Sequence, residues 1–295
     1  MTIPATESPS ALHPELDTYS SERLVEAFLS DQKNALDAVQ AAIPALTRAV
    51  AAAVPRLQRG GRLIYIGAGT SGRLGALDAA ELMPTFSWPP ERALGVLAGG
   101  PAALTAAIEG AEDNAEQAVY DLSALALTAQ DVVILISASG RAPYVISAAQ
   151  VARAAGALTI ALTNNSGAPL VGHADIAVEL LTGPELISGS TRLKAGTAQK
   201  VALNTFSSSC MVQLGKVYGN LMVDLRATND KLRRRALALV QLASGADEPM
   251  AQTALQAAEG QVKTAILMLR SGIDAPTARQ RLQAVDGFLR KALGA

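Results

Sequence analysis

The sequence predicts an α/β fold: a three-layer α/β/α sandwich built around a mainly parallel, five-stranded sheet. Two observations support it. Short, continuously apolar segments alternate with segments of helical periodicity, the pattern of parallel strands covered on both faces. Glycine, serine or threonine follows most of these apolar segments directly, as is typical of a strand that turns into a helix. An N-terminal helical arm and a small C-terminal helical domain complete the expected fold.

The five expected strands are short and rich in Val, Ile, Leu and Ala. They span residues 62–66, 93–97, 131–136, 158–162 and 175–180. Ligands of such sheets bind beyond the carboxyl ends of the strands, so the loops that follow the strands are the first place to look for a site.

The flanking regions are predicted to be helical. Residues 22–58 have apolar residues at three- and four-residue steps, and Pro44 and Pro55 predict breaks or kinks within them. Residues 193–244 predict long helices with a break near Gly215 and Gly219, and residues 250–295 predict three short helices. We therefore divide the chain into an N-terminal arm with helices (1–58), a ligand-binding domain with its following helices (59–244) and a small three-helix domain (245–295).

Composition narrows the class of protein. Hydrophobic residues make up 49% of the 295 residues, which is enough for a sizeable core. The 25 Lys and Arg nearly balance the 26 Asp and Glu, which argues against a nucleic-acid partner. No basic N-terminal region precedes an apolar stretch, and no apolar run approaches the ~20 residues that span a bilayer. We expect a cytoplasmic protein without a membrane partner.

Metal, thiol and cofactor chemistry are not expected. The two histidines, His13 and His173, are far apart and belong to no cluster with ligand spacing. The single cysteine, Cys210, stands among small and apolar residues, so we expect it to be buried. A serine nucleophile would lack a paired histidine.

The first glycine loop, residues 67–72, follows the first strand with the pattern G-x-G-x-x-G. A dinucleotide-binding fold would also place an acid at the end of the next strand, but 98–100 read Ala-Gly-Gly. A monophosphate is therefore favoured, with Gly69, Thr70 and Ser71 as candidates to bind it. The alternative is a tight strand-to-helix turn with no ligand.

Two further segments offer anion-binding groups. Residues 137–140, Ser-Ala-Ser-Gly, follow the third strand, and Ser137 and Ser139 could bind phosphate or sugar hydroxyls. Lys194, just before an apolar helix, could neutralise an anion. The alternatives are an ordinary turn and a surface lysine.

Glu81 and Glu112 are the candidate acid–base pair. Glu81 lies about one helix length along the chain from the first glycine loop. Glu112 comes after the second expected strand. Two carboxyls at one rim of the sheet can divide proton donation from proton abstraction. Spacing alone favours the alternative, two solvated acids near helix ends.

Several motifs, taken together and in order, resemble the N-acetylmuramic acid 6-phosphate etherases. They are residues 67–75, 77–81, 109–113, 139–144, 189–200 and 215–224. The likeness extends from Thr6 to about Leu232 and is looser over 245–295. It implies a sugar isomerase (SIS) domain, a homodimer, a sugar-phosphate substrate and cleavage of a D-lactyl ether. It also implies that Glu81 and Glu112 match the family's acid–base pair.

The chemistry of the implied substrate suggests a lyase mechanism. In the ring-opened sugar, the C1 aldehyde acidifies the C2 proton, and the lactyl ether at C3 can then be eliminated. We hypothesise that Glu112 is the base and Glu81 the acid, with water adding afterwards. The competing functions are a non-catalytic sugar-phosphate sensor similar to the glucokinase regulatory protein, a sugar-phosphate isomerase, and a DNA-binding regulator. Residues 1–60 lack the basic helix-turn-helix arm that a regulator should carry.

Overall fold

The computed structural model describes residues 3–225 and 230–294. These fall into two compact units, which we describe separately. The first comprises Met1–Ala80 and Glu91–Ser207, and the second comprises Glu81–Pro90 and Ser208–Ala295. The division falls within two helices, α3 and α6.

The first unit contains a five-stranded sheet in the order β2-β1-β3-β4-β5, with every neighbouring pair parallel. The strands are β1 (Leu63–Gly67), β2 (Ala93–Leu97), β3 (Val132–Ile136), β4 (Leu158–Thr163) and β5 (Ile176–Glu179). The predicted fold class is confirmed, because each strand lies where the apolar segments predict it, within one residue at either end.

The register brings the carboxyl ends of the central strands to one level. Gly67, the last residue of β1, lies opposite Leu97 of β2 and Ile136 of β3. Ile136 in turn lies opposite Leu162 of β4. The loops that follow these strands therefore leave the sheet at the same rim, where ligands of parallel sheets bind.

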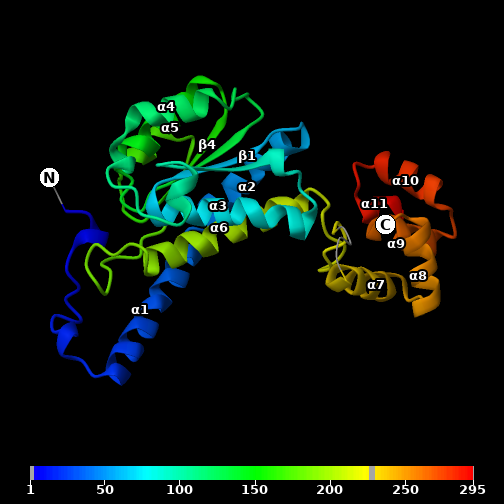
Figure 1. Ribbon diagram of the computed structural model, residues 1–295, viewed down its shortest axis with the longest axis horizontal. Helices are drawn as coiled ribbons and strands as arrows, with labels where there is room; N and C mark the ends of the chain where they lie inside the picture. Colours follow the sequence, from blue (N-terminus) through cyan, green and yellow to red (C-terminus); the bar gives the residue numbers. More distant parts are fainter. Residues whose placement is uncertain (1–2, 226–229, 295) are drawn as a thin grey trace. The chain divides into compact units, whose positions relative to one another are not determined.

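Helices cover both faces of the sheet. The helices of this unit are α1 (Ser21–Ala41), α2 (Ile43–Gln58), α3 (Gly69–Phe86), α4 (Ala115–Ser123), α5 (Pro143–Ala154) and α6 (Lys194–Gln213), of which α1 packs against α2. Ile64 and Ile66 share a buried cluster with residues of α4 and α5. Tyr65 alternates to the opposite face, as successive strand residues do, and contacts α3. Figure 1 shows α4 and α5 on one side of the sheet and α2, α3 and α6 on the other.

Proline breaks the helical region at one position but not at another. Pro44 stands in the first turn of α2, where its missing N–H costs no helical hydrogen bond, so the predicted break is confirmed there. The sequence predicts a break or a kink at Pro55; a break there is wrong, because α2 continues to Gln58, and a kink stays a prediction. Val54 and Leu57 are buried on either side of this proline, and that burial outweighs one lost hydrogen bond.

The described part of the chain also contains six short 3-10 helices. They are η1 (Ala5–Glu7), η2 (Leu16–Thr18), η3 (Pro90–Arg92), η4 (Pro101–Leu104), η5 (Ala111–Asp113) and η6 (Pro169–His173).

The second unit is helical. Its own helices are α7 (Asp230–Ser244), α8 (Glu248–Ala257), α9 (Val262–Ser271), α10 (Ala275–Gln283) and α11 (Leu289–Ala292). The described residues after 245 thus form four helices where the sequence predicts three. Asp247 and Asp274 accept hydrogen bonds from the first turns of α8 and α10, which caps those helices. Cys210 is fully buried, as predicted. The domain boundaries at 58/59 and 244/245 stay a proposal.

None of the individual helices in residues 3–225 and 230–294 has both the length and the apolar character to cross a membrane. Only α1 and α2 together, across a 54° bend, reach that length and composition.

Candidate functional site

The first glycine loop is a turn that only glycine can make. A Cβ on Gly72 would lie 2.1 Å from Leu97 Cδ1 and 2.5 Å from the carbonyl oxygen of Gly67. Gly69, the first residue of α3, has a φ of 53°, in the left-handed region. The backbone therefore passes directly from β1 into α3, and the N–H groups of the first helical turn lie at the rim of the sheet.

Thr70 and Ser71 project from this turn in different ways. Thr70 is half-buried, and a Cβ on Gly196 would lie 3.5 Å from its Cγ2, so it faces the first turn of α6. Ser71 is buried and its hydroxyl donates a 2.9 Å hydrogen bond to Gln199 Oε1. Gln199 Nε2 then donates to Asn164 Oδ1 at 2.9 Å. Ser71 thus supports the loop as well as lining the rim.

Residues 137–140, which we call the serine loop, lie beside the first glycine loop, because β3 is the neighbour of β1 in the sheet. Ser137 is buried, and its Oγ accepts the N–H of Gly140 at 3.1 Å. Ser139 is half-buried, and its Oγ accepts the N–H of Arg141 at 3.2 Å. Since both hydroxyls accept in these bonds, each can still donate its own proton to a ligand. The structure therefore brings the predicted residues of both loops to one rim.

Lys194 is the first residue of α6. It is buried, so the alternative prediction of a surface lysine is wrong. Only 3% of it is exposed, and its Nζ lies 2.6 Å from Asp31 Oδ1 on α1. Asp31 already neutralises this ammonium, so an incoming anion would have to compete with Asp31 for its charge. The role of Lys194 in binding phosphate stays a prediction.

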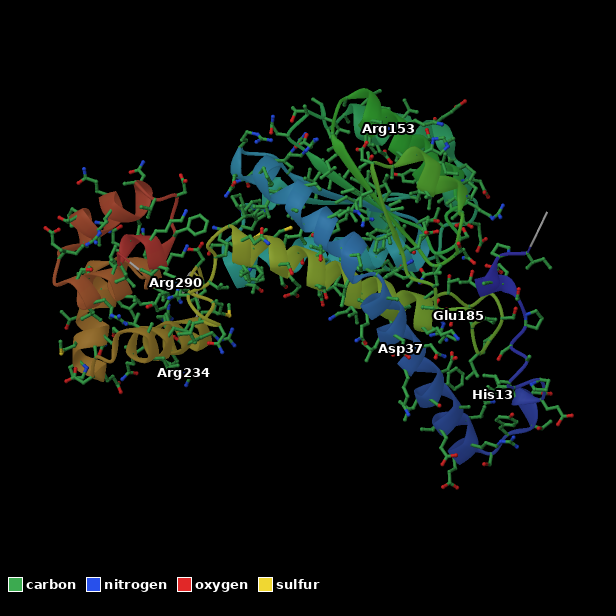
Figure 2. All side chains as sticks on the ribbon, turned by 180° about the vertical axis from the view of Figure 1, so that it is seen from behind. His13, Asp37, Arg153, Glu185, Arg234 and Arg290 are labelled. Carbon is green, nitrogen blue, oxygen red and sulfur yellow. The ribbon has the colours of Figure 1, made fainter. Side chains whose placement is uncertain are left out.

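The start of α6 already holds a carboxylate. The N–H groups of Lys194 and Ala195 donate to the two oxygens of Glu185 at 3.1 and 2.9 Å. Glu185, labelled in Figure 2 at the start of this helix, is fully buried. Burial raises the pKa of its carboxyl, although the two backbone donors oppose the shift. The N-terminus of α6 is therefore capped from within the chain.

Glu112 is exposed and lies in η5 of the first unit. Gly110, with a φ of 71°, precedes it, and the side chain of Asn114 after it caps α4 by accepting the N–H of Gln117. Residues on either side of Glu112 line a cavity of about 420 Å³ beyond the end of β2. Glu112 therefore lies next to this cavity in the chain, although its own side chain does not line it.

Glu81 is also exposed and lies on α3, in the part of the helix that belongs to the second unit. Glu81 and Glu112 therefore belong to different units, and their action on one ligand stays a prediction.

The sequence prediction missed four residues of this rim: Asn164, Asn165, Glu185 and Gln199. A partial signal was visible for the two asparagines, because polar residues directly follow the apolar fourth strand. Gln199 lies within a helix and Glu185 in an irregular loop, so neither has a local sequence pattern that marks it.

Among the residues that the structure describes, no group of three or more His, Cys, Asp or Glu side chains is placed to hold a metal ion.

Comparison with protein-family models and with solved structures identifies the fold of the first unit. Residues 45–154 match the family model of the glucokinase regulatory protein N-terminal SIS domain, and residues 112–209 match that of the SIS domain. Among solved structures, the phosphoheptose isomerase of Neisseria gonorrhoeae aligns with a TM-score of 0.50 and 20% identity, over 65% of this chain and 98% of that one. The fold is therefore of the SIS type.

Curated relatives are far more similar in sequence. The N-acetylmuramic acid 6-phosphate etherase of Deinococcus radiodurans is 60% identical over 259 residues, which is 87% of this chain and 85% of that protein. The protein of the same name from Pectobacterium atrosepticum is 48% identical over 99% of this chain and 95% of its own. This chain belongs to the N-acetylmuramic acid 6-phosphate etherase family. Etherase relatives thus match the second unit as well as the SIS domain.

Proposed function

We propose that the protein is a carbon–oxygen lyase that cleaves the D-lactyl ether of N-acetylmuramic acid 6-phosphate. Its products would be N-acetylglucosamine 6-phosphate and D-lactate. The observation that carries the proposal is the 60% identity to a relative of that name over most of both chains. The reaction would place the protein in the recycling of cell-wall amino sugars.

The proposed chemistry needs two protons to move. A base removes the proton at C2 of the open-chain sugar, beside the C1 aldehyde. An acid donates a proton to the ether oxygen at C3 as lactate leaves and the C2–C3 double bond forms. Water then adds across that bond, with its oxygen at C3. We assign the base to Glu112 and the acid to Glu81, each expected to contribute about 10²–10⁴-fold.

The rim would hold the part of the substrate that does not react. The hydroxyls of Thr70, Ser137 and Ser139 and the N–H groups at the start of α3 are donors suited to a phosphate monoester. Ser71 supports the first loop through Gln199. Binding energy gained at the phosphate can orient C2 and C3 against the carboxylates.

The setting of the reaction is also a proposal. We propose a cytoplasmic homodimer that needs no cofactor and has neither a nucleic acid nor a membrane as a partner. The near balance of acidic and basic residues supports the absence of a nucleic-acid surface.

A sensor without catalysis is the second candidate. The match of residues 45–154 to the glucokinase regulatory protein SIS domain favours it, because such a domain can bind a sugar phosphate without chemistry. The presence of both Glu81 and Glu112 favours the etherase.

Incubation with N-acetylmuramic acid 6-phosphate in heavy-oxygen water tests the proposal. We expect free D-lactate without label, and N-acetylglucosamine 6-phosphate with the heavy oxygen at C3. Label in lactate instead would mean cleavage on the other side of the ether oxygen. Binding of the sugar phosphate without any lactate would favour the sensor.

A further inference from the structure

Thr6, near the N-terminus, is joined directly to two loops of the first unit, the loop after β4 and the loop before α6. Its N–H donates to Asn165 Oδ1 at 3.3 Å, and its Oγ1 accepts from Asn165 Nδ2 at 2.9 Å. Its carbonyl oxygen accepts the N–H of Gly189 at 3.1 Å. Thr6 is completely buried, so these bonds are shielded from water.

Asn165 links Thr6 to the serine loop by a further hydrogen bond. Its Nδ2 donates a second hydrogen bond to the carbonyl oxygen of Ala138, also at 2.9 Å. Ala138 stands between Ser137 and Ser139, the two hydroxyls that we expect to bind the sugar phosphate. The N-terminal segment therefore restrains the backbone of that loop through one asparagine.

The N-terminal segment, residues 5–7, forms a further hydrogen bond at Glu7, the residue after Thr6. Ser188 Oγ donates to the carbonyl oxygen of Glu7 at 2.7 Å. A Cβ on Gly189 would lie 2.9 Å from Glu7 Oε2, so the Glu7 side chain lies directly over this glycine. Gly189 begins the stretch that leads into Lys194 at the start of α6. The N-terminal segment thus also restrains the approach to α6.

Hydrophobic burial does not explain these contacts. Thr6 is the only buried residue of η1, while Ala5 and Glu7 on either side of it are exposed. A segment that buries so little apolar surface adds little to the hydrophobic stability of the unit. Its hydrogen bonds instead go to the loop that follows β4 and to the loop before α6.

We propose that Thr6 is a positioning residue for the sugar-phosphate site: through Asn165 and Gly189 it holds the serine loop and the approach to α6 in the arrangement that binds substrate. This inference rests on the proposed function for the identity of the ligand. Loosening the connection would let the free protein populate other loop arrangements. The apparent dissociation constant then rises in inverse proportion to the competent fraction.

The test compares Thr6→Val with Thr6→Ser. Valine keeps the shape and the two backbone bonds but loses the Oγ1 acceptor for Asn165, whereas serine retains it. For Thr6→Val we expect the dissociation constant for N-acetylglucosamine 6-phosphate, measured by titration calorimetry, to rise about tenfold, as it would if about a tenth of the free protein stayed competent. KM for lactate release should rise alike, with kcat within about twofold. Thr6→Ser should restore both.

Thr18→Val is the matched control. Thr18 lies on the same N-terminal arm and its hydroxyl donates to the carbonyl oxygen of Glu15, away from the rim. Its binding should equal that of the wild type. Ser188→Ala is a second variant at an exposed residue, which removes the other hydrogen bond to the segment without disturbing the core. It should raise the dissociation constant in the same direction, by about threefold.

The results that would refute the role of Thr6 differ from the result that would refute the proposed function. Equal sugar-phosphate affinity for Thr6→Val, Ser188→Ala and the wild type would refute the positioning role of Thr6. So would a weaker affinity that Thr6→Ser shares with Thr6→Val. A wild type that binds the sugar phosphate but releases no lactate would refute the proposed function. Because calorimetry needs no turnover, the affinities of the variants would still test the role of Thr6.

Discussion

Ser71 in the first glycine loop donates a 2.9 Å hydrogen bond to Gln199 in α6, although 128 positions separate them in the chain. Gln199 in turn donates to Asn164, directly after β4. One buried amide therefore connects a loop, a helix and a strand end around the candidate site. The connection fixes the hydroxyl of Ser71 before any ligand arrives.

Replacing Gln199 with leucine should destabilise the protein and weaken ligand binding. The substitution leaves Ser71 Oγ and Asn164 Oδ1 without this partner in a buried place, a loss of about 2 kcal/mol of unfolding free energy. Urea denaturation measures it. The control is Lys200→Ala, at an exposed neighbouring position, which should change the unfolding free energy by less than about 0.5 kcal/mol. Equal stability of the Gln199 variant and the control would contradict the structure.

Two glycines of the first loop should respond differently to alanine. Gly72→Ala puts a Cβ 2.1 Å from Leu97 Cδ1 and 2.5 Å from a backbone oxygen, so β1 and α3 must separate. At Gly69 the Cβ would meet nothing within 4 Å, and only the positive φ of 53° is strained. We expect Gly69→Ala to cost about 1–2 kcal/mol and Gly72→Ala clearly more. Thermal unfolding of both variants gives the order, and the reverse order would be incompatible with the turn.

Glu81→Gln and Glu112→Gln test the proposed acid and base. Each amide keeps the shape of the side chain but cannot exchange the proton, so we expect lactate release to fall about 10²–10⁴-fold. Binding of N-acetylglucosamine 6-phosphate should change little. If Glu112 is the base, Glu112→Gln also abolishes exchange of the C2 proton with deuterated water, which nuclear magnetic resonance detects. Full activity of either variant would remove that residue from the mechanism.

The ion pair between Arg62 and Asp131 should give the protein an acid-sensitive component of stability. Asp131 is nearly fully buried, and Arg62 Nη2 lies 2.7 Å from its Oδ2. Burial alone raises the pKa of Asp131, but hydrogen bonds from Arg62 and Thr128 outweigh it and hold that pKa below the ordinary value. A carboxyl with a lowered folded-state pKa stabilises the protein above its unfolded-state pKa. That contribution is lost as the pH falls through the folded-state value.

Asp131→Asn therefore has a pH-dependent effect. At pH 7 the variant should lose about 3 kcal/mol of unfolding free energy, because the charge of Arg62 loses its carboxylate partner. Below about pH 4 the difference from the wild type should begin to shrink, because Asp131 of the unfolded chain takes up a proton there, and it should vanish as the pH falls through the lower folded-state pKa. Urea denaturation across this range measures the difference. A difference that stays constant down to acid pH would mean that the charge of Asp131 contributes nothing.

Some of this protein could be predicted from local sequence. The five strands follow from apolar runs that a sheet covered on both faces requires, and the glycines of residues 67–72 follow from the sharp turn after β1. Ser137 and Ser139 could be predicted as rim residues, because parallel strands end at one edge of their sheet. Each of these features depends on a few consecutive residues.

Contacts between distant segments could not be predicted in the same way. The pairing of Lys194 with Asp31 and the bond between Thr6 and Asn165 join residues more than 150 positions apart. Pro55 stays inside a helix because its neighbours are buried in the tertiary core. These features depend on which segments fold against one another, and that information is absent from any short window.

The sequence by itself determined the parallel sheet, the glycine turn and the candidate residues at the rim, since periodicity and backbone sterics act locally. Only the tertiary structure decided that Lys194 is paired and buried, that Glu185 caps α6, and that Thr6 joins the loop after β4 to the loop before α6. The physical reason is that a buried polar group must find its partner wherever the fold brings one within hydrogen-bonding distance.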